Sequence, residues 1–404
     1  LMLAPTRELA EQIYRETLRL CNGRRLKICL LKKTTKTKSN NHDESSTKSG
    51  SGSGSNAYSS YDILISTPLR LVRLIREKLI NLNSVRMVIL DEADKLFELK
   101  KHGRSIDGSS GDGGGGGDTD SESEDDTHQN SNSRSRSAFL GQVDEILSEC
   151  PNDNTMHRAL FSATIGTMVI ELANQFLKNY IQLNIGVENT GANTIDQKLV
   201  FVGREDGKLL AIQQIIQNGI KPPVIIFVQS IERAKDLYHE LVYDGINIDV
   251  IHAEKSSNVR EDIIKRFRNG NIWVLICTEL MARGVDFKGI NMVINYDLPQ
   301  SSVDYIHRIG RTGRAGKKGL AITLFTEADI PRLRTIANIV KQSGCDVPDW
   351  MLKIPKLTTK EKRTLRNFAP IRRKIDTAIR PSKEVLAATA ATAATAVGGA
   401  TNVG

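Results

Sequence analysis

Short apolar runs alternate with amphipathic stretches along most of the chain. Between the runs, apolar residues recur at helical spacing, as at Ile231, Ala234, Leu237, Tyr238 and Leu241. This alternation predicts the α/β fold class, with parallel sheets whose strands are buried on both faces. The runs that we interpret as strands are residues 61–67, 85–90, 158–164, 198–203, 223–230, 248–253, 272–278, 291–297 and 320–325.

Three segments lack this alternation. Residues 34–60 and 101–137 are rich in Ser, Gly, Asp and Asn, and the end of the chain from about residue 386 is rich in Ala and Thr. None of them can bury enough apolar surface to offset the entropy of ordering, so we expect disorder. The first two are interpreted as insertions in surface loops, which are thermodynamically tolerable.

The spacing of the strands predicts two parallel-sheet domains rather than one. We assign residues 1–185 to the first domain and residues 195–345 to the second. Residues 186–194, rich in Gly, Asn and Thr, are the expected linker. Residues 346–404 form a tail that is first basic and then rich in Ala and Thr.

The charge of the chain indicates a polyanionic partner. The formal net charge is +9, and because residues 101–137 carry a net −4, the remainder carries +13. Such an excess is typical of proteins that bind nucleic acid. Residues 352–383 hold eleven Lys and Arg against two acidic residues. This stretch is interpreted as an arm that binds RNA phosphates or as a nuclear address, the alternative being a solvated helix flank.

Cysteine usage and hydropathy exclude several protein classes. The five cysteines are odd in number and none lies in a C-x-x-C pair, which argues against a disulfide framework and structural zinc and favours reduced thiols inside the cell. No apolar run reaches 18 residues, so we predict no membrane span. We find no signal peptide.

Polar motifs follow several predicted strands. Ligands of open α/β sheets bind outside the carboxyl ends of the strands, where one carboxylate can hold Mg²⁺ and a neighbour can orient water. The motifs of the first domain are APTRELA (4–10), STPLR (66–70), DEAD (91–94) and SAT (162–164). Those of the second are FVQS (227–230), TELMARGVDF (278–287) and HRIGRTGRAG (307–316).

The last of these motifs places Arg308, Arg311 and Arg314 at three-residue intervals. On a helix, this spacing would put the three guanidinium groups on nearly one face. Guanidinium groups can stabilise the charge that develops on a transferred phosphoryl group. The alternative is a solvated basic loop.

Together and in this order, the motifs resemble those of the DEAD-box RNA helicases over residues 1–345, apart from the two insertions. The resemblance implies two RecA-like domains that close together on ATP and RNA, with Mg²⁺ bound to the nucleotide. Residues 222–256 and 273–299 resemble the subfamily that acts in small ribosomal subunit assembly. That subfamily works in the nucleus and nucleolus on precursor ribosomal RNA, near a snoRNA–pre-rRNA duplex of the small-subunit particle. We expect a monomer.

The resemblance implies roles for the acidic motif of the first domain. Asp91 would hold Mg²⁺ through water, and Glu92 would orient the hydrolytic water as general base. Asp94 would connect this motif to Ser162 and Thr164, which couples the nucleotide to domain closure.

In the second domain, the resemblance implies that Gly284 and Asp286 belong to the nucleotide site, with Asp286 on the ribose. Arg311 and Arg314 would contact the γ-phosphate, Arg314 as the arginine finger. His307 would lie at the domain interface.

The remaining motif positions would contact RNA at phosphate and 2′-OH groups, without reading its sequence. In the first domain these are Pro5, Thr6, Arg7, Glu8, Thr67 and Arg70. In the second they are Gln229, Ser230, Arg260 and Thr278.

One motif of the family is missing from these residues. No G-x-x-x-x-G-K-[ST] phosphate loop occurs in the 404 residues, and in the family this loop precedes the PTRELA motif. The sequence begins at Leu1 in mid-pattern, so we expect an N-terminally truncated chain whose first domain lacks at least one central strand. Such a chain would hydrolyse ATP weakly or not at all. The alternatives to a helicase are a catalytically inactive RNA-binding module and a DNA helicase with the same core.

Overall fold

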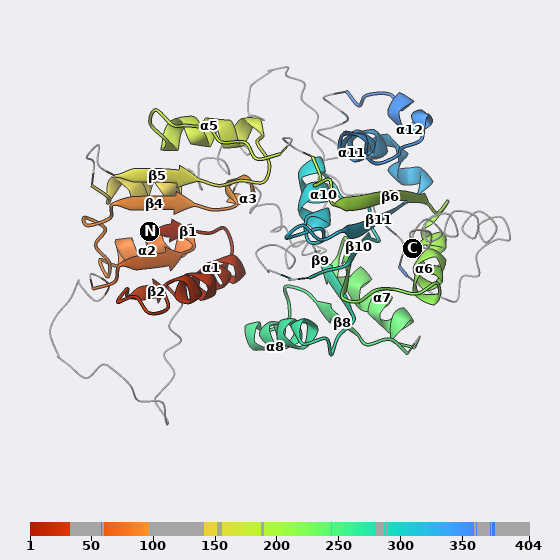
Figure 1. Ribbon diagram of the computed structural model, residues 1–404, viewed down its shortest axis with the longest axis horizontal. Coiled ribbons are helices and arrows are strands. Elements are labelled where there is room, and N and C mark those ends of the chain that lie inside the picture. Colours follow the sequence, from red (N-terminus) through yellow and green to blue (C-terminus); the bar gives the residue numbers. More distant parts are fainter. Residues whose placement is uncertain are drawn as a thin grey trace, which may run out of the picture. The chain divides into compact units, whose positions relative to one another are not determined.

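The chain folds into two compact units, Leu1–Gln182 and Leu183–Gly404, each with helices packed against a parallel sheet (Figure 1). The structure is a computed structural model, and it describes residues 1–32, 58, 60–96, 141–151, 156–186, 190–243, 245–278, 287, 289–358, 361, 372 and 374–375. The two predicted insertions and the Ala/Thr-rich end lie almost wholly outside the described residues.

The first unit has a five-stranded sheet in the order β2-β3-β1-β4-β5, and every pair of neighbours is parallel. Its strands are β1 (Met2–Leu3), β2 (Ile28–Leu30), β3 (Ile63–Ser66), β4 (Met87–Leu90) and β5 (His157–Leu160). Its helices are α1 (Arg7–Leu20), α2 (Pro68–Arg76), α3 (Ala93–Leu96) and α5 (Thr167–Phe176), with a further helical stretch at residues 141–148. The three strands predicted in this region are present, while the short β1 and β2 were not predicted.

Two helices of this unit start directly after strands. Thr6 follows β1 and caps α1, its hydroxyl accepting a hydrogen bond from the Leu9 N–H at 3.3 Å. Thr67 follows β3 and stands in the cap position of α2, whose first residue is Pro68. The N-termini of both helices therefore lie at the carboxyl edge of the sheet.

The second unit has a six-stranded parallel sheet in the order β6-β11-β10-β7-β9-β8. Its strands are β6 (Ile195–Phe201), β7 (Val224–Val228), β8 (Ile248–Ile251), β9 (Val274–Thr278), β10 (Met292–Asn295) and β11 (Gly319–Phe325). Its helices are α6 (Glu205–Gln217), α7 (Ile231–Val242), α8 (Ser257–Arg268), α10 (Ser302–Ile309), η1 (Glu327–Asp329), α11 (Ile330–Gln342) and α12 (Asp349–Lys353). All six predicted strands of this unit are present.

The central strand β7 is buried on both faces. Ile225 and Phe227 pack in one apolar cluster with Phe267 of α8. The alternate residues, such as Ile226, pack in another cluster with Leu237 of α7. This two-sided burial explains why the strand reads as a continuous apolar run.

Part of the predicted tail belongs to the second unit. Met351 of α12 is buried in the same apolar cluster as Leu333 of α11. Further along, Ile375 is only 8% exposed and packs with the α6 and α7 residues of another cluster. The alternative of a solvated flank is therefore wrong for Met351 and Ile375, while other described tail positions, such as Lys356, are exposed.

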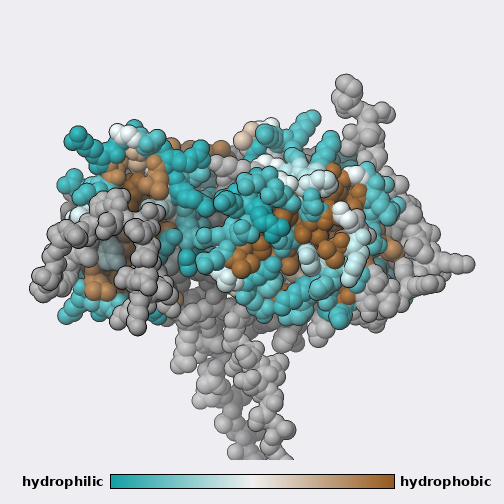
Figure 2. Space-filling model, turned by 90° about the horizontal axis from the view of Figure 1, so that it is seen from below, coloured by the Kyte–Doolittle hydropathy of each residue, from teal (hydrophilic) through white to brown (hydrophobic). Residues whose placement is uncertain are grey.

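No helix among the described residues is long and apolar enough to cross a lipid bilayer. The face of the molecule in Figure 2 is mostly hydrophilic where it is coloured, with hydrophobic residues gathered in patches on both units.

Candidate functional site

The predicted motifs of the first unit meet at the carboxyl edge of its sheet. Pro5 follows β1, Thr67 follows β3, Asp91 follows β4 and Ser162 lies shortly after β5. Backbone hydrogen bonds continue the ladder past the strand ends, from Asp91 N–H to Leu3 O at 3.0 Å and from Phe161 N–H to Leu90 O at 2.8 Å. Residues from four separate segments are thus brought to one edge, as the parallel topology predicts.

The acidic motif begins with a strained turn. Glu92 has φ +46°, in the left-handed region that residues with a side chain rarely adopt. Its N–H donates to Oδ1 of Asp91 at 2.9 Å, and the N–H of Ala93 donates to the Phe161 carbonyl at 3.0 Å. Strain of this kind persists only where the surroundings impose it, and it is often found at functional sites.

Asp91 lies in an environment that favours a bound cation. Burial raises the pKa of this carboxyl, and the nearby Glu92 and Asp94 charges act in the same direction, against one backbone hydrogen bond that lowers it. A positive ion beside Asp91 would relieve this. Mg²⁺ suits the position because it is usually held by one or two carboxylates together with water and substrate phosphates. The described residues contain no cluster of three His, Cys, Asp or Glu side chains that could hold a metal by themselves.

Within the described residues, Asp94, unlike Asp91, has a side-chain hydrogen-bond donor from another segment. Its side chain accepts a 2.6 Å hydrogen bond from the hydroxyl of Thr164, and both residues are buried. The hydroxyl of Ser162 donates to the carbonyl oxygen of Thr164 at 2.7 Å. The structure therefore connects the acidic motif to the segment after β5 directly through Thr164, and Ser162 joins the connection through the Thr164 backbone.

The other predicted contacts of the first unit surround two helix N-termini. Arg7 is exposed at the start of α1 and pairs with Glu11 at 2.9 Å, while Glu8 next to it is half-buried. Arg70, in the first turn of α2, donates to the carbonyl of Lys32 at 3.1 Å. Helix N-termini present N–H groups and a positive dipole, which suits phosphate.

The second unit also gathers predicted residues at its carboxyl edge. Gln229 and Ser230 follow β7, and the Ser230 hydroxyl caps α7 by accepting from Arg233 N–H at 3.3 Å. Thr278 ends β9 and is buried, while Arg260 stands in the first turn of α8 and is half-buried. Gly284 and Asp286 lie outside the described residues.

The three arginines of HRIGRTGRAG do not share a helix face, so that prediction is wrong. Helix α10 ends at Ile309, where Gly310 closes it by donating to the Ile306 carbonyl. Only Arg308 is helical, whereas Arg311 and Arg314 stand in the turns that follow. The helix thus ends before the second arginine, and Gly313 continues the chain with φ +69°, in the left-handed region that a glycine adopts without strain.

The arginine segment also lies at the other edge of the sheet from Gln229. The Thr312 hydroxyl donates to the carbonyl of Ile290, just before β10, at 2.6 Å. The Thr194 hydroxyl, just before β6, donates to the Gly313 carbonyl at 2.8 Å. The prediction that this motif follows the carboxyl end of a strand is therefore wrong, because α10 carries the chain back to the amino ends.

Glycine is required at position 313. Its φ is +69°, and a Cβ there would lie 2.5 Å from a carbon of the Ile195 side chain.

Exposure separates the roles of the arginines. Arg308 is 3% exposed, donates to the Asp297 carbonyl at 2.9 Å and stacks 5.2 Å above the Phe227 ring, so it holds the fold. Arg311 is 6% exposed and donates to the His307 carbonyl at 3.3 Å. Arg314 is exposed, its Nε donating to the Gly310 carbonyl at 2.8 Å. Half-buried His307 lies on α10.

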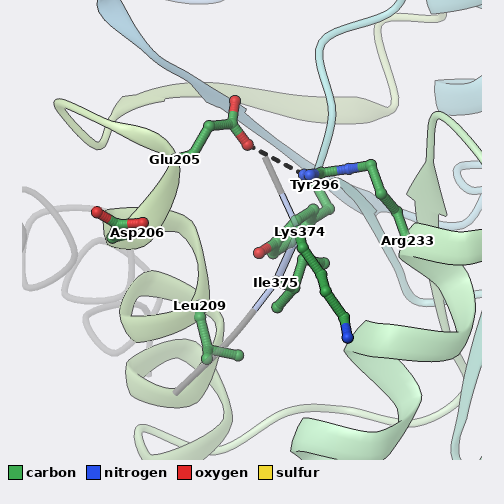
Figure 3. Close-up of a pocket in the computed structure, with 7 residues that line it drawn as sticks. All are labelled: Glu205, Asp206, Leu209, Arg233, Tyr296, Lys374 and Ile375. Carbon is green, nitrogen blue, oxygen red and sulfur yellow. Dashed lines mark hydrogen bonds and ion pairs between the residues drawn. The ribbon is translucent and has the colours of Figure 1, made fainter. Parts of the chain in front are cut away.

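A buried charge cluster next to Gln229 was not predicted. Its carboxylate, Asp297, follows β10, and the Gln229 N–H donates to it at 2.9 Å. In Figure 3, Glu205 of α6 pairs with Arg233 of α7, and Ile375 of the tail lies between the two helices. The only sign of this cluster in the sequence is the stretch NYD (295–297) at the end of an apolar run. The residues that pair with Asp297 are far from it along the chain, so the sequence does not identify them.

Two family models match the chain. "DEAD/DEAH box helicase" matches residues 1–109, and "Helicase conserved C-terminal domain" matches residues 207–316.

Curated relatives align with most of the chain. "Probable ATP-dependent RNA helicase ddx52" of Dictyostelium discoideum is 47% identical over 90% of this chain and 47% of its own length. "ATP-dependent RNA helicase ROK1" of Meyerozyma guilliermondii is 43% identical over 93% of this chain and 61% of its own length. The rat "Probable ATP-dependent RNA helicase DDX52" is 42% identical over 90% and 53%. The chain thus spans about half to three fifths of these relatives.

A solved structure has the same fold. Saccharomyces cerevisiae Dbp5 bound to RNA and ADP BeF₃ superposes with a TM-score of 0.62, at 25% identity, over 90% of this chain and 80% of Dbp5. The predicted fold class, two parallel-sheet α/β units of the RecA-like kind, is confirmed.

Proposed function

We propose that this chain, which belongs to the DEAD-box helicases, forms most of the ATP-hydrolysing and RNA-binding core of an ATP-dependent RNA helicase, to which a phosphate loop must be added. The observation that carries the proposal is the acidic turn at the carboxyl edge of the first unit. In this turn Glu92 has a strained backbone, and burial and neighbouring charges raise the pKa of Asp91. A buried hydrogen bond joins Asp94 to Thr164.

Within this proposal, the acidic motif serves the nucleotide. Asp91 holds Mg²⁺ through water, and the ion, when bound, neutralises charge on the phosphates. Glu92 accepts a proton from the attacking water as general base. The Asp94–Thr164 hydrogen bond transmits the state of this turn to the segment after β5, together with Ser162.

Arg314 is the better candidate for the arginine finger. Because Arg311 is 6% exposed while Arg314 is exposed, only Arg314 can extend to a ligand without leaving a packed position. Arg311 and His307 would support it from the end of α10. Gly284 and Asp286 complete the nucleotide site in the proposal.

RNA would bind along the carboxyl edges of the two sheets. In the first unit, Thr6, Arg7, Thr67 and Arg70 surround the N-termini of α1 and α2, where backbone N–H groups suit phosphates. Pro5 and Glu8 shape the same turn. In the second unit the contacts are Gln229, Ser230, Arg260 and Thr278, the buried Thr278 through its backbone.

The substrate that we propose is precursor ribosomal RNA of the small subunit, at a snoRNA–pre-rRNA duplex in the nucleolus. Support comes from residues 222–256 and 273–299, which resemble that subfamily, and from the similarity to the ddx52 and ROK1 helicases. Ultraviolet crosslinking of the tagged protein in cells tests this. Crosslinks should concentrate on small-subunit precursor RNA, and a profile dominated by messenger RNA would contradict the assignment.

Strand displacement tests the activity. The 404-residue chain is joined behind the phosphate-loop segment of a family member, and release of a labelled strand from a short RNA duplex is followed with and without ATP. We expect ATP-dependent release from RNA and much less from a DNA duplex of the same sequence. Equal release from both duplexes would indicate a DNA helicase, and no release with intact RNA binding would indicate an inactive binding module.

A further inference from the structure

A cluster of buried charges lies where α6 and α7 meet the end of β10. The carboxylate of Asp297, fully buried, accepts from Lys208 Nζ at 2.9 Å and from Arg233 Nε and Nη2, each at 2.8 Å. Glu205 pairs with the same two cations at 3.0 Å. Burial alone would raise the pKa of Asp297, but the surrounding cations outweigh burial and hold that pKa well below its usual range.

A third cation reaches this cluster from the C-terminal part of the chain. The side chain of Arg372 is 3% exposed, and its guanidinium contacts Glu205 at 2.5 Å and Asp329 at 2.7 Å. Its Nε donates to Oε1 of Gln229 at 2.8 Å. Three residues further on, Ile375 packs into the apolar cluster of α6 and α7. Arg372 is thus a charged anchor and Ile375 an apolar anchor of this part of the chain.

Arg372 balances the charge of the cluster. Among the described residues, the three carboxylates named above face two buried cations, Lys208 and Arg233, until Arg372 makes a third. Arg332 also stands near Asp329, but it is only half-buried. Without Arg372, buried Asp329 would lose its 2.7 Å ion pair and keep the hydrogen bonds from Thr326, and loss of one partner of a buried ion pair is among the more destabilising changes in a protein interior.

Gln229 is held at both ends by the same cluster. Its backbone N–H donates to Asp297 at 2.9 Å, and its side-chain oxygen accepts from Arg372. With the oxygen fixed on the guanidinium, the direction of the amide nitrogen is also fixed. That nitrogen is the side-chain group that can donate to an RNA phosphate or 2′-OH.

We propose that Arg372, Lys374 and Ile375, which we call the strap, are an integral part of the second unit, and that Arg372 is a positioning residue that orients Gln229 for RNA. The positioning role rests on the proposed function, in which Gln229 contacts RNA. The strap then organises the RNA edge in advance rather than covering it.

A double-mutant cycle tests the positioning role. Binding of a fluorescent single-stranded RNA to the 404-residue chain is measured for wild type, Arg372→Met, Gln229→Ala and the double variant. We expect Arg372→Met to weaken binding roughly tenfold, and to cost little more once Gln229 is Ala. Lys341→Ala removes the same charge from an exposed position on α11, outside the basic stretch of residues 352–383, and should change binding by less than about twofold.

Two results of the cycle would overturn the positioning role. Tighter RNA binding by Arg372→Met would mean that the strap covers the site. An equal loss in the Gln229→Ala background would mean that Arg372 contacts RNA by itself.

Thermal unfolding tests the docking of the strap independently of RNA. Both tryptophans, Trp273 and Trp350, lie in the second unit, so their fluorescence reports its unfolding. We expect Arg372→Met to lower Tm by roughly 10 °C and Ile375→Ala to lower Tm and RNA affinity together, while Lys341→Ala leaves both unchanged. Arg372→Lys keeps the positive charge but not the planar guanidinium group, so it should lower Tm and RNA affinity less than Arg372→Met does. If Arg372→Met does not fold, Arg372→Lys takes its place in both measurements.

The outcomes separate this inference from the proposed function. A Tm of Arg372→Met within about 1 °C of wild type would overturn the strap, whatever the RNA data. If the wild-type chain binds no RNA while Arg372→Met still lowers Tm, the proposed function and the positioning role fail and the docked strap stands.

Discussion

At the scale of single residues, similar side chains within one motif do different work. Asp91 and Asp94 are three positions apart, yet Asp94 is buried on the Thr164 hydroxyl while burial and neighbouring charge raise the pKa of Asp91. Likewise, Arg308 is packed on Phe227 and Arg314 is exposed. Residue type alone does not assign these roles, because burial and hydrogen-bond partners decide them.

The contrast between the arginines yields a paired prediction. Arg314→Ala should leave the Tm of the second unit unchanged and lower ATP turnover about 10³-fold in the chain that carries a phosphate loop. Arg311→Ala should lower Tm, because a buried guanidinium is lost. Tryptophan fluorescence and a phosphate-release assay measure the two effects. If ATP turnover of Arg314→Ala falls only a few-fold, another residue must be the arginine finger.

The Asp94–Thr164 hydrogen bond gives a stability prediction. Thr164→Val removes the donor from a buried carboxylate, which should cost about 1–3 kcal/mol locally. Hydrogen exchange should accelerate in peptides that cover residues 87–96 and 157–164. Ser162→Ala, which removes only a bond to a backbone carbonyl, serves as the milder control. Unchanged exchange in Thr164→Val would show that the bond does not hold the two segments together.

At the scale of elements, the strands were predictable where burial is two-sided. β7 and β9 are buried along their whole length, and both read as continuous apolar runs. β6 was predicted at 198–203 but spans Ile195–Phe201. Its first residues were missed because Asp196, Gln197 and Lys198 are polar and interrupt the apolar pattern. Gln197 there is buried and accepts from the Tyr305 hydroxyl at 2.9 Å, a partner that sequence spacing does not reveal.

The part of the site that was predicted wrongly depends on where a helix ends. The three-residue spacing of the arginines indicated a helix face, but α10 ends at Ile309, before Arg311. The acidic motif was easier to place, because it follows directly on the apolar strand β4 and the parallel topology fixes its edge.

The segment η1 contributes to a pH dependence. Burial would raise the pKa of Asp329 in η1 and of Asp297 after β10, but Arg372 and, for Asp297, Lys208 and Arg233 lower both below their usual 3.8. A carboxyl with a lowered pKa in the folded state adds stability that is complete above about pH 5 and declines as the pH falls below its unfolded value. The contribution of these two carboxyls to the Tm of the second unit should therefore change little from pH 7 to 5 and decline increasingly as the pH falls below about 4.

Asp329→Asn is the control for this pH dependence. It removes one titrating carboxyl, so its Tm should fall less on acidification than that of wild type. Equal falls for the two proteins would show that Asp329 does not titrate with a lowered pKa.

At the scale of the whole molecule, the charge cluster shows what the sequence does not reveal. It joins positions 205, 233, 297, 329 and 372, which come from five separate segments. The basic stretch was interpreted from its net charge as an RNA arm, yet one of its arginines is buried on carboxylates. Composition states how many charges a chain has, while their pairing depends on long-range packing.

The most direct test of a nucleotide-driven RNA helicase is RNA-stimulated ATP hydrolysis with wild type and Glu92→Gln, each joined to the phosphate-loop segment. We expect RNA to stimulate wild type, and Glu92→Gln to bind ATP and RNA while its turnover falls at least about 10²-fold, as for loss of a general base. Turnover of Glu92→Gln near that of wild type, or no response of wild type to RNA, would contradict the assignment.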